Sequence, residues 1–156
     1  MLHMKGESTD IVGSDRLVQG LGAGMFAGLI MSILDLILLA RGWIEFAYYD
    51  WGLSLIKGTT AHNLFEMVVG QVTHILFSGM LGIVFAYAVV LVSSQNHLLK
   101  GWLYGIAVWF SVHFVVNLFA FDPLRPIPTS QVLSDFFTAS VYGLVLSMAL
   151  HRLSRK

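Results

Sequence analysis

Four long apolar stretches constrain the fold of this chain more than any other feature of its sequence. They cover residues 17–40, 64–92, 101–121 and 131–150. A helix needs roughly 20 mainly apolar residues to cross a hydrocarbon core about 30 Å thick, and backbone groups in lipid must be paired within their own segment. The stretches therefore predict an all-α polytopic membrane protein, in which a bundle of four transmembrane helices forms one membrane domain over residues 1–156.

The composition agrees with a lipid bilayer as the main partner of the chain. Of the 156 residues, 56% are hydrophobic and only 12% are charged, whereas an ordinary soluble domain is about 25% charged. The formal net charge is zero, and because there is no long basic block we expect no nucleic-acid partner. The sequence holds no cysteine, so any bound metal would need histidine and carboxylate ligands.

The connections between the apolar stretches predict how neighbouring helices pack. Residues 93–100 form a short polar link, and the proline-rich turn at 122–128 is also short. We therefore expect the second and third helices, and likewise the third and fourth, to be antiparallel neighbours. The first connection, 41–63, is longer and rich in Trp and Tyr, which favour the membrane–water boundary. We expect part of it to form an interfacial segment between the first two helices.

Basic residues near the helix ends predict the orientation of the chain. More of them lie on the side of the two termini than on the opposite side, and cytoplasmic flanks carry an excess of Lys and Arg. We therefore expect a multi-pass protein with both termini in the cytoplasm. The residues on the side of the termini are Lys5, Arg16, Lys100, Arg152, Arg155 and Lys156, and those on the other side are Arg41, Lys57 and Arg125.

Small or polar residues recur every four positions along each apolar stretch. This spacing places them on one inclined ridge of the helix surface, and small residues let helix backbones approach closely in a membrane. The pattern does not distinguish contacts within one chain from contacts in a homo-oligomer or with other membrane subunits. The glycines for which we predict helix packing are Gly20, Gly24, Gly28, Gly82, Gly105 and Gly143.

Polar residues inside the apolar stretches are the candidate functional residues. We predict a polar intramembrane cluster of Asp35, His74, His113 and Asn117 in the outer half of the bundle. An ionisable side chain at bilayer depth costs a few kcal/mol, so such a residue usually faces the bundle interior or a water-filled cavity. At a rise of about 1.5 Å per residue, His74 lies roughly 15 Å and His113 roughly 12 Å from the outer boundary.

The matched depth of His74 and His113 leaves several interpretations open. Each can be a neutral imidazole that hydrogen-bonds a neighbouring helix, or a group that titrates near its ordinary pKa of about 6.5. Alternatively, the two can bind a divalent cation or the iron of haem b, although nothing in the sequence requires a cofactor. No nucleophile and base stand at suitable depth on one helix, so we predict no catalytic residues and no enzymatic activity.

Short motifs along the chain carry a family resemblance. They are Thr73-His74-Ile75-Leu76-Phe77-Ser78, Val84-Phe85-Ala86-Tyr87, Trp102 with Gly105, Val112-His113-Phe114 and the proline-rich turn after Phe121. Together with the glycine-rich first helix, they resemble the YagU-like and YqhR-like families of small bacterial inner-membrane proteins. The resemblance implies a bacterial cytoplasmic-membrane location. It implies no defined activity and no catalytic residues.

Three classes of function are consistent with these sequence features. In the first, the polar cluster handles ions, protons or a small solute, for which histidine is suited by its pKa. In the second, the chain is a non-catalytic accessory or assembly subunit whose glycine ridges contact other membrane subunits. In the third, His74 and His113 are the axial ligands of a haem b in a redox subunit.

Overall fold

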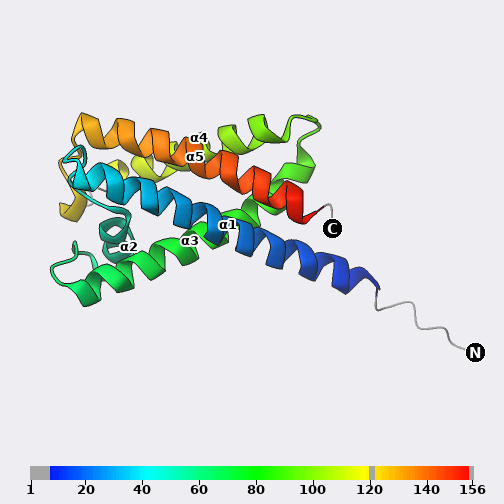
Figure 1. Cartoon of the computed structure of the whole chain (residues 1–156), viewed down its shortest axis with the longest axis horizontal. Helices are drawn as coiled ribbons and strands as arrows, with labels where there is room; N and C mark the ends of the chain where they lie inside the picture. The colour runs from blue at the N-terminus through cyan, green and yellow to red at the C-terminus, as the bar shows by residue number, and fades with distance from the viewer. Residues whose placement is uncertain (1–7, 120–121, 155–156) are drawn as a thin grey trace, which may run out of the picture.

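The described part of the protein is entirely helical between its turns. The structure is a computed structural model that describes the backbone of residues 8–119 and 122–154 and the side chains of residues 16–119 and 123–154. Four long helices and one short helix, together with a single 3-10 turn, make up the fold, which is therefore all-α as expected (Figure 1). The elements are α1 (Ser8–Ala40), α2 (Tyr48–Lys57), α3 (Leu64–Leu91), α4 (His97–Leu118), η1 (Asp122–Leu124) and α5 (Thr129–Leu153).

The four long helices are the expected membrane spans. Each contains a segment long and apolar enough to cross a membrane, namely Arg16–Ala40, Leu64–Leu91, His97–Leu118 and Thr129–Leu153. The protein is thus a multi-pass membrane protein. Helix α4 begins four residues earlier than expected because the Asn96 side chain accepts a hydrogen bond from Leu99 N and caps the helix start. The expected end of this helix at Phe121 lies outside the described residues.

The two ends of the bundle hold different parts of the chain. Helix α1 begins and helix α5 ends at one end, whereas α2 and the connection from α4 to α5 lie at the other (Figure 1). We call this second end the α2 end. An even number of spans brings both ends of the chain to the same side, in agreement with this arrangement.

Close contacts at glycine join the long helices into two pairs, α1 with α3 and α4 with α5. A Cβ at Gly20 or Gly24 would collide with α3 around Gly82, and a Cβ at Gly105 would collide with α5 at Ala139. Contacts between α1 and α5 join the two pairs. The six glycines expected to pack helices therefore do so within one chain. Gly28 meets Ser78 of α3, and Gly143 meets Gly101 of α4.

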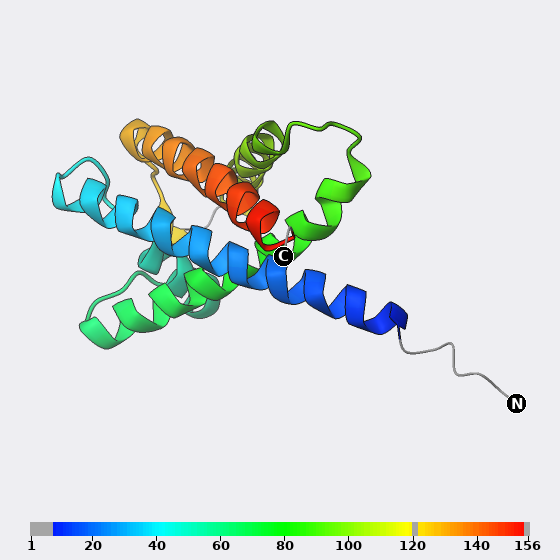
Figure 2. The ribbon, with the colours of Figure 1, turned by 45° about the vertical axis from the view of Figure 1, so that its right-hand side comes forward.

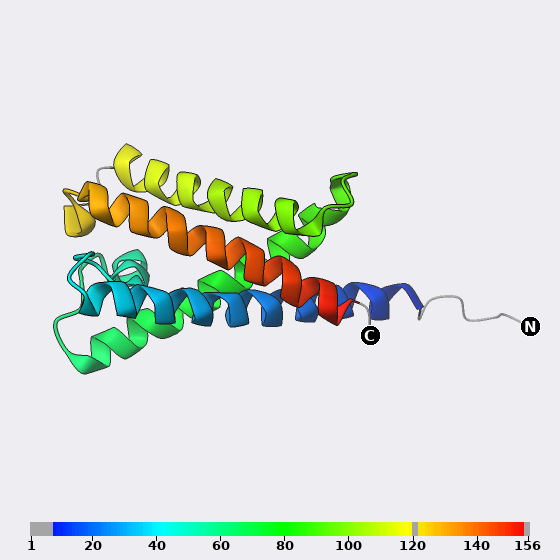
Figure 3. The ribbon, with the colours of Figure 1, turned by 45° about the horizontal axis from the view of Figure 1, so that its top comes forward.

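The expectation that the second and third spans pack side by side is wrong. Helices α3 and α4 touch where the Tyr104 hydroxyl donates to Leu81 O over 2.6 Å and where Tyr104 packs on Phe85. From there they diverge toward the α2 end (Figures 2 and 3). The physical reason is that the small-residue ridge of α3 faces α1 and that of α4 faces α5, so neither ridge is left to join α3 to α4.

Helix α2 is re-entrant, because the chain leaves α1, turns back into the bundle and then runs outward along α3. Tyr48, the first residue of α2, donates its backbone N–H to Asp35 Oδ2 over 2.8 Å, and its ring stacks on His74 with centroids 4.5 Å apart. At the other end of α2, Lys57 pairs with Glu66. At about 1.5 Å per residue, His74 lies about 15 Å and Glu66 about 3 Å into α3. The N-terminus of α2 is therefore its deeper end.

The connection between the first two spans thus holds a helix with one buried and one exposed face. Trp51 and Leu53 are 7% and 2% exposed, whereas Leu55 and Ile56 are both 60% exposed. A Cβ at Gly52 would collide with the carbonyl of Gly70, so the absence of a side chain lets α2 lie directly on α3. The segment expected at the interface starts inside the bundle and ends at its edge.

A single added methyl group distinguishes the packing role of Gly82 from that of Gly22. In Gly82→Ala the new Cβ would lie 2.6 Å from Gly24 Cα, whereas at Gly22 nothing lies within 4 Å. We expect Gly82→Ala to lower the free energy of unfolding by about 1–3 kcal/mol through overpacking. The control Gly22→Ala should leave it unchanged or slightly higher, because alanine is the better helix former. Thermal unfolding in detergent measures both, and equal midpoints for the two variants would contradict the α1–α3 contact.

Candidate functional site

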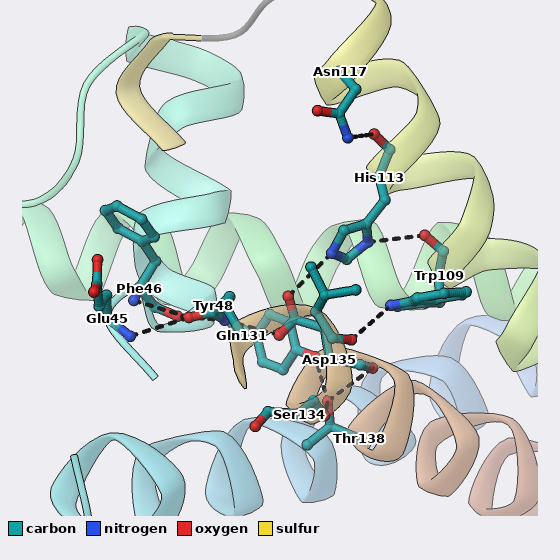
Figure 4. A network of polar contacts seen from close by, with 11 residues as sticks. Glu45, Phe46, Tyr48, Trp109, His113, Asn117, Gln131, Ser134, Asp135 and Thr138 are labelled. Atoms are coloured by element: carbon teal, nitrogen blue, oxygen red, sulfur yellow. Dashed lines mark hydrogen bonds and ion pairs between the residues drawn. The ribbon is translucent and has the colours of Figure 1, made fainter. Parts of the chain in front are cut away.

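The segment that leads into α2 is the first part of the site, because its backbone is not helical and runs from exposed Glu45 to buried Ala47 within the bundle. Gln131 of α5 binds it from one side: its Oε1 accepts from Glu45 N over 3.1 Å and from Phe46 N over 3.2 Å, and its Nε2 donates to Phe46 O over 3.1 Å (Figure 4). Non-helical backbone at membrane depth is tolerated only where the protein pairs it. Gln131, which is fully buried, supplies this pairing.

Two carboxyl groups complete the pairing at the start of α2. Asp35 accepts from Tyr48 N, and Asp50 Oδ2 accepts from Ala47 N over 3.1 Å. The other oxygen of Asp50 accepts from Ala61 N over 2.9 Å and so holds the far end of the connection. Burial raises the pKa of the Asp50 carboxyl above its ordinary value, while the hydrogen bonds from Ala61 and Ala47 oppose that rise. Negative charge at this position is also favoured by the α2 dipole.

Asp135 and His113 face each other beside this re-entrant segment. Asp135 Oδ1 accepts from Gln131 Nε2 over 2.9 Å, and Asp135 Oδ2 lies 3.4 Å from His113 Nε2. The second distance is longer than an ordinary hydrogen bond, and both atoms are buried without a hydrogen-bond partner. Figure 4 shows the imidazole directed from α4 toward the carboxyl group of α5.

The hydrogen bond of the other ring nitrogen of His113 decides which nitrogen is left to face Asp135. Nδ1 lies 3.0 Å from Trp109 O, and a carbonyl oxygen can only accept, so Nδ1 carries a hydrogen. A neutral imidazole would then present a lone pair at Nε2 toward a carboxylate oxygen, and two acceptors repel. One shared proton removes this conflict, whether it resides on the imidazole or on the carboxyl group.

His74 occupies a different environment from His113. Its ring lies against Tyr48, and its Nε2 is 3.4 Å from Ser78 Oγ, which itself donates to His74 O over 2.9 Å. The Tyr48 hydroxyl lies 2.5 Å from Thr138 Oγ1 of α5. Tyr48 therefore connects His74 on α3 to the helix that carries Asp135.

A cavity of about 760 Å³ fills the space between the diverging helices α3 and α4. This volume is within the range of small-molecule sites, about 300–1,000 Å³. Exposed side chains such as Phe77 of α3, Val115 of α4 and Leu55 of α2 belong to its lining, so the cavity opens sideways between the spans. Its inner wall includes both histidines and Asp135, together with Tyr48, Trp51, Tyr104, Trp109, Ala139 and Tyr142.

The structure brings together three of the four residues expected in the polar cluster. Asp35 and His74 meet at Tyr48, and His113 lies on the same cavity as His74. Asn117 is exposed, and its Nδ2 donates to His113 O on its own helix over 2.9 Å. It therefore lies apart from the other three.

The surroundings of the histidines bear on the ligands they could hold. Within the described residues no group of three or more His, Cys, Asp or Glu side chains is placed to bind a metal ion. Joint ligation of a haem iron would need one free nitrogen from each imidazole. In His113, Nδ1 bonds Trp109 O and Nε2 faces Asp135, while in His74 the ring is covered by Tyr48.

Sequence reasoning missed Gln131, Asp135 and Tyr48 as members of the site. Asp135 stands at the head of a row of small residues, Ala139, Gly143 and Ser147, on the packing ridge of α5. A carboxyl group on such a ridge faces another helix rather than water, and Gln131 lies one turn earlier on the same ridge. That position is the signal in the sequence that could have identified both residues. Asp135 also lies near the N-terminus of its helix, where the dipole favours negative charge, so a carboxyl group there does not by itself indicate a site.

The hydrogen bonds of Gln131 predict a large loss of stability when it becomes apolar. Gln131→Leu leaves two N–H groups and one C=O group of the re-entrant segment unpaired, and a buried unpaired group costs about 1–3 kcal/mol. We expect a loss of about 2–4 kcal/mol or more in the free energy of unfolding, measured in detergent.

The matched control is Gln71→Leu, which removes one hydrogen bond, from Gln71 Nε2 to Ser32 Oγ, and leaves no backbone group unpaired. We expect a smaller loss, about 1 kcal/mol. The chain has no cysteine, so a cysteine placed at Ala47 reports on the segment: its maleimide labelling should rise in Gln131→Leu and not in Gln71→Leu. Equal labelling in both would show that Gln131 does not hold the segment.

Comparisons with known proteins give no match to this chain. No family model matches it, and neither a curated protein nor a solved structure does. The resemblance to the YagU-like and YqhR-like families stays a prediction from short sequence motifs, and the geometry of the site is the basis on which a function can be proposed.

Proposed function

We propose that the protein takes up and releases a proton at the His113–Asp135 pair while it handles a small solute in the adjoining cavity. The observation that carries this proposal is the 3.4 Å approach of His113 Nε2 and Asp135 Oδ2, both buried and lacking a hydrogen-bond partner. Both residues also line the cavity between α3 and α4. A group that holds a proton therefore adjoins a space large enough for a ligand.

The charge of the pair explains why proton release would depend on the solute. With one proton shared, the imidazole and the carboxyl group are together neutral. Without it, the site carries an uncompensated negative charge, which is expensive away from water. The proton can leave only when water or a ligand stabilises the carboxylate that remains, so occupancy of the cavity and protonation of the pair are linked.

A role as a non-catalytic accessory subunit has less support from the contacts. That hypothesis needs glycine ridges that are free to contact other proteins. Gly20, Gly24, Gly28 and Gly82 are instead in contact between α1 and α3, and Gly101, Gly105 and Gly143 between α4 and α5. Docking of another subunit would have to use the exposed apolar faces, which lipid also covers.

We place the protein in a bacterial cytoplasmic membrane with both termini in the cytoplasm, on the support of the Lys and Arg bias and the family resemblance. Single cysteines test this orientation, because the chain has none of its own. We expect a membrane-impermeant maleimide to label His62→Cys, at the α2 end, in intact spheroplasts. Gln95→Cys, between α3 and α4, should label only after permeabilisation. The reverse pattern would mean an inverted protein with its cavity site nearer the cytoplasm.

Tryptophan fluorescence tests whether the pair exchanges a proton. Trp51 and Trp109 pack on the His113 ring with centroids 5.5 and 5.3 Å away, and an imidazolium quenches indole emission more strongly than a neutral imidazole. We propose that the shared proton resides on Nε2, as an imidazolium beside the Asp135 carboxylate. We therefore expect emission of the purified protein to rise reversibly with pH as the pair loses this proton. His113→Gln should abolish this transition.

The control for the fluorescence experiment is His97→Gln, which changes a histidine that stacks on His151 at the other end of the bundle. It should titrate like the wild type. A wild-type transition that persists in His113→Gln, or no transition across the pH range in which the fold is stable, would contradict the proposed function.

A further inference from the structure

We infer that the cavity between α3 and α4 binds a lipophilic monocation in exchange for the proton that His113 and Asp135 hold. The inference rests on the proposed function, because it names the class of solute that the same site would handle. Three properties of the cavity support it: an apolar wall with a lateral opening, aromatic side chains around the inner end, and a buried carboxyl group as its acidic member.

The wall of the cavity favours a ligand that is mostly hydrocarbon. Its lining is dominated by aliphatic and aromatic side chains. Val115 on α4 and Phe119, the residue after α4, are 49% and 72% exposed at its rim. In a bilayer these rim residues face lipid, so a lipophilic molecule can enter sideways from the hydrocarbon core. A strongly hydrated ion would lose its water against such a wall without compensation.

Aromatic rings surround the inner end of the cavity, where the pair lies. The electron-rich faces of Trp and Tyr attract a cation within about 6 Å of the ring centroid, and they do so more strongly when water is excluded. Trp51 and Trp109 both pack on the same imidazole, which Asp135 faces. The aromatic residues in the lining are Tyr48, Trp51, Phe77, Tyr104, Trp109, Phe119 and Tyr142.

The charges around the pair select for positive rather than negative ligands. Among the described residues that line the cavity, none is Lys or Arg, and Asp135 is the one carboxylic acid. Asp35 and Asp50 lie close enough to interact with one another, and Asp35 also interacts with Asp135. The titratable groups around the pair and its cavity are Asp35 from α1, Tyr48 from α2, His74 from α3, Tyr104 from α4 and Tyr142 from α5.

The exchange balances at one proton for one cation. In the resting site the proton neutralises the pair. When a monocation binds, the proton passes to water, the carboxylate of Asp135 pairs with the cation, and His113 is left as a neutral imidazole with Nδ1–H on Trp109 O. The site is neutral in both states, and no covalent bond other than that to the transferred proton changes. Asp135, with 4% of its surface exposed and Oδ2 unpartnered, is the group that the cation would satisfy.

Isothermal titration calorimetry with tetraphenylphosphonium tests the exchange on the full chain in detergent. Titrations in two buffers of different ionisation enthalpy give the number of protons released, for which we expect one per cation. Where the pair is protonated, the affinity should fall about tenfold for each unit by which the pH is lowered. The neutral probe triphenylphosphine oxide should bind at least about tenfold more weakly and without proton release, because it gains nothing from the carboxylate.

Variants separate the site from non-specific partitioning into the detergent micelle. Asp135→Asn keeps the size of the side chain and an acceptor for Gln131, and it should lower the cation affinity about tenfold or more and abolish proton release. The control His97→Gln should match the wild type. Thermal unfolding of each variant checks its fold, and proton release by the wild type is informative even if Asp135→Asn does not fold.

The outcomes distinguish this inference from the proposed function. Binding without proton release, or equal and pH-independent binding of the neutral probe, would overturn the cation assignment in favour of a neutral lipophilic ligand. A fluorescence transition that depends on His113, together with no cation binding, would overturn the inference and leave the proposed function standing. If neither the transition nor cation binding is found, both fail.

Discussion

The site depends on how a short stretch of non-helical backbone is hydrogen-bonded inside the bundle. The N–H groups of residues 45–47 precede α2 and have no helical partners, and unpaired backbone groups in hydrocarbon cost several kcal/mol each. Gln131 pairs three of these groups, and Asp35 and Asp50 accept the next two N–H groups. Side chains from α5, α1 and α2 itself therefore converge on one segment. Because Gln131 on α5 and Asp35 on α1 both bond this segment, its length limits how far apart α1 and α5 can lie at the α2 end. The same bonds set where α2 begins.

The cavity is a consequence of this arrangement and of the glycine contacts. The close contact at Gly82 packs α3 against α1, and the close contact at Gly105 packs α4 against α5. Helix α2 then lies on α3 through Gly52 and Gly70, and its insertion keeps α3 away from α4. The helix spans and the ridges could be predicted because hydropathy and a spacing of four residues are local properties. The short link at 93–100 predicts only that α3 and α4 run antiparallel; it carries no information about the distance between them at the far end.

The candidate site was predictable only in part, for a related reason. Asp35, His74 and His113 stand out because an ionisable group within an apolar stretch is expensive wherever it points. Asn117 belongs to the same pattern, but its amide can bond the carbonyl one turn earlier on its own helix, and this satisfies it without a partner elsewhere. The contribution of Tyr48 depends on α2 turning inward. Aromatic residues are equally suited to the interface and to the core, so their presence in 41–63 cannot reveal that turn.

The pairing of Asp135 with a histidine, rather than with Lys or Arg, decides what the site can do. An Arg would hold its proton under all conditions, and the ion pair would be fixed. An imidazole whose Nδ1–H is committed to Trp109 O has only Nε2 left to gain or lose a proton, and this atom faces Asp135. The same low dielectric that makes an unpaired carboxylate expensive also strengthens its attraction to any cation that reaches it. In the exchange that we propose, protonation and cation binding at Asp135 are therefore alternatives, because each supplies the one positive charge that the buried carboxyl group lacks.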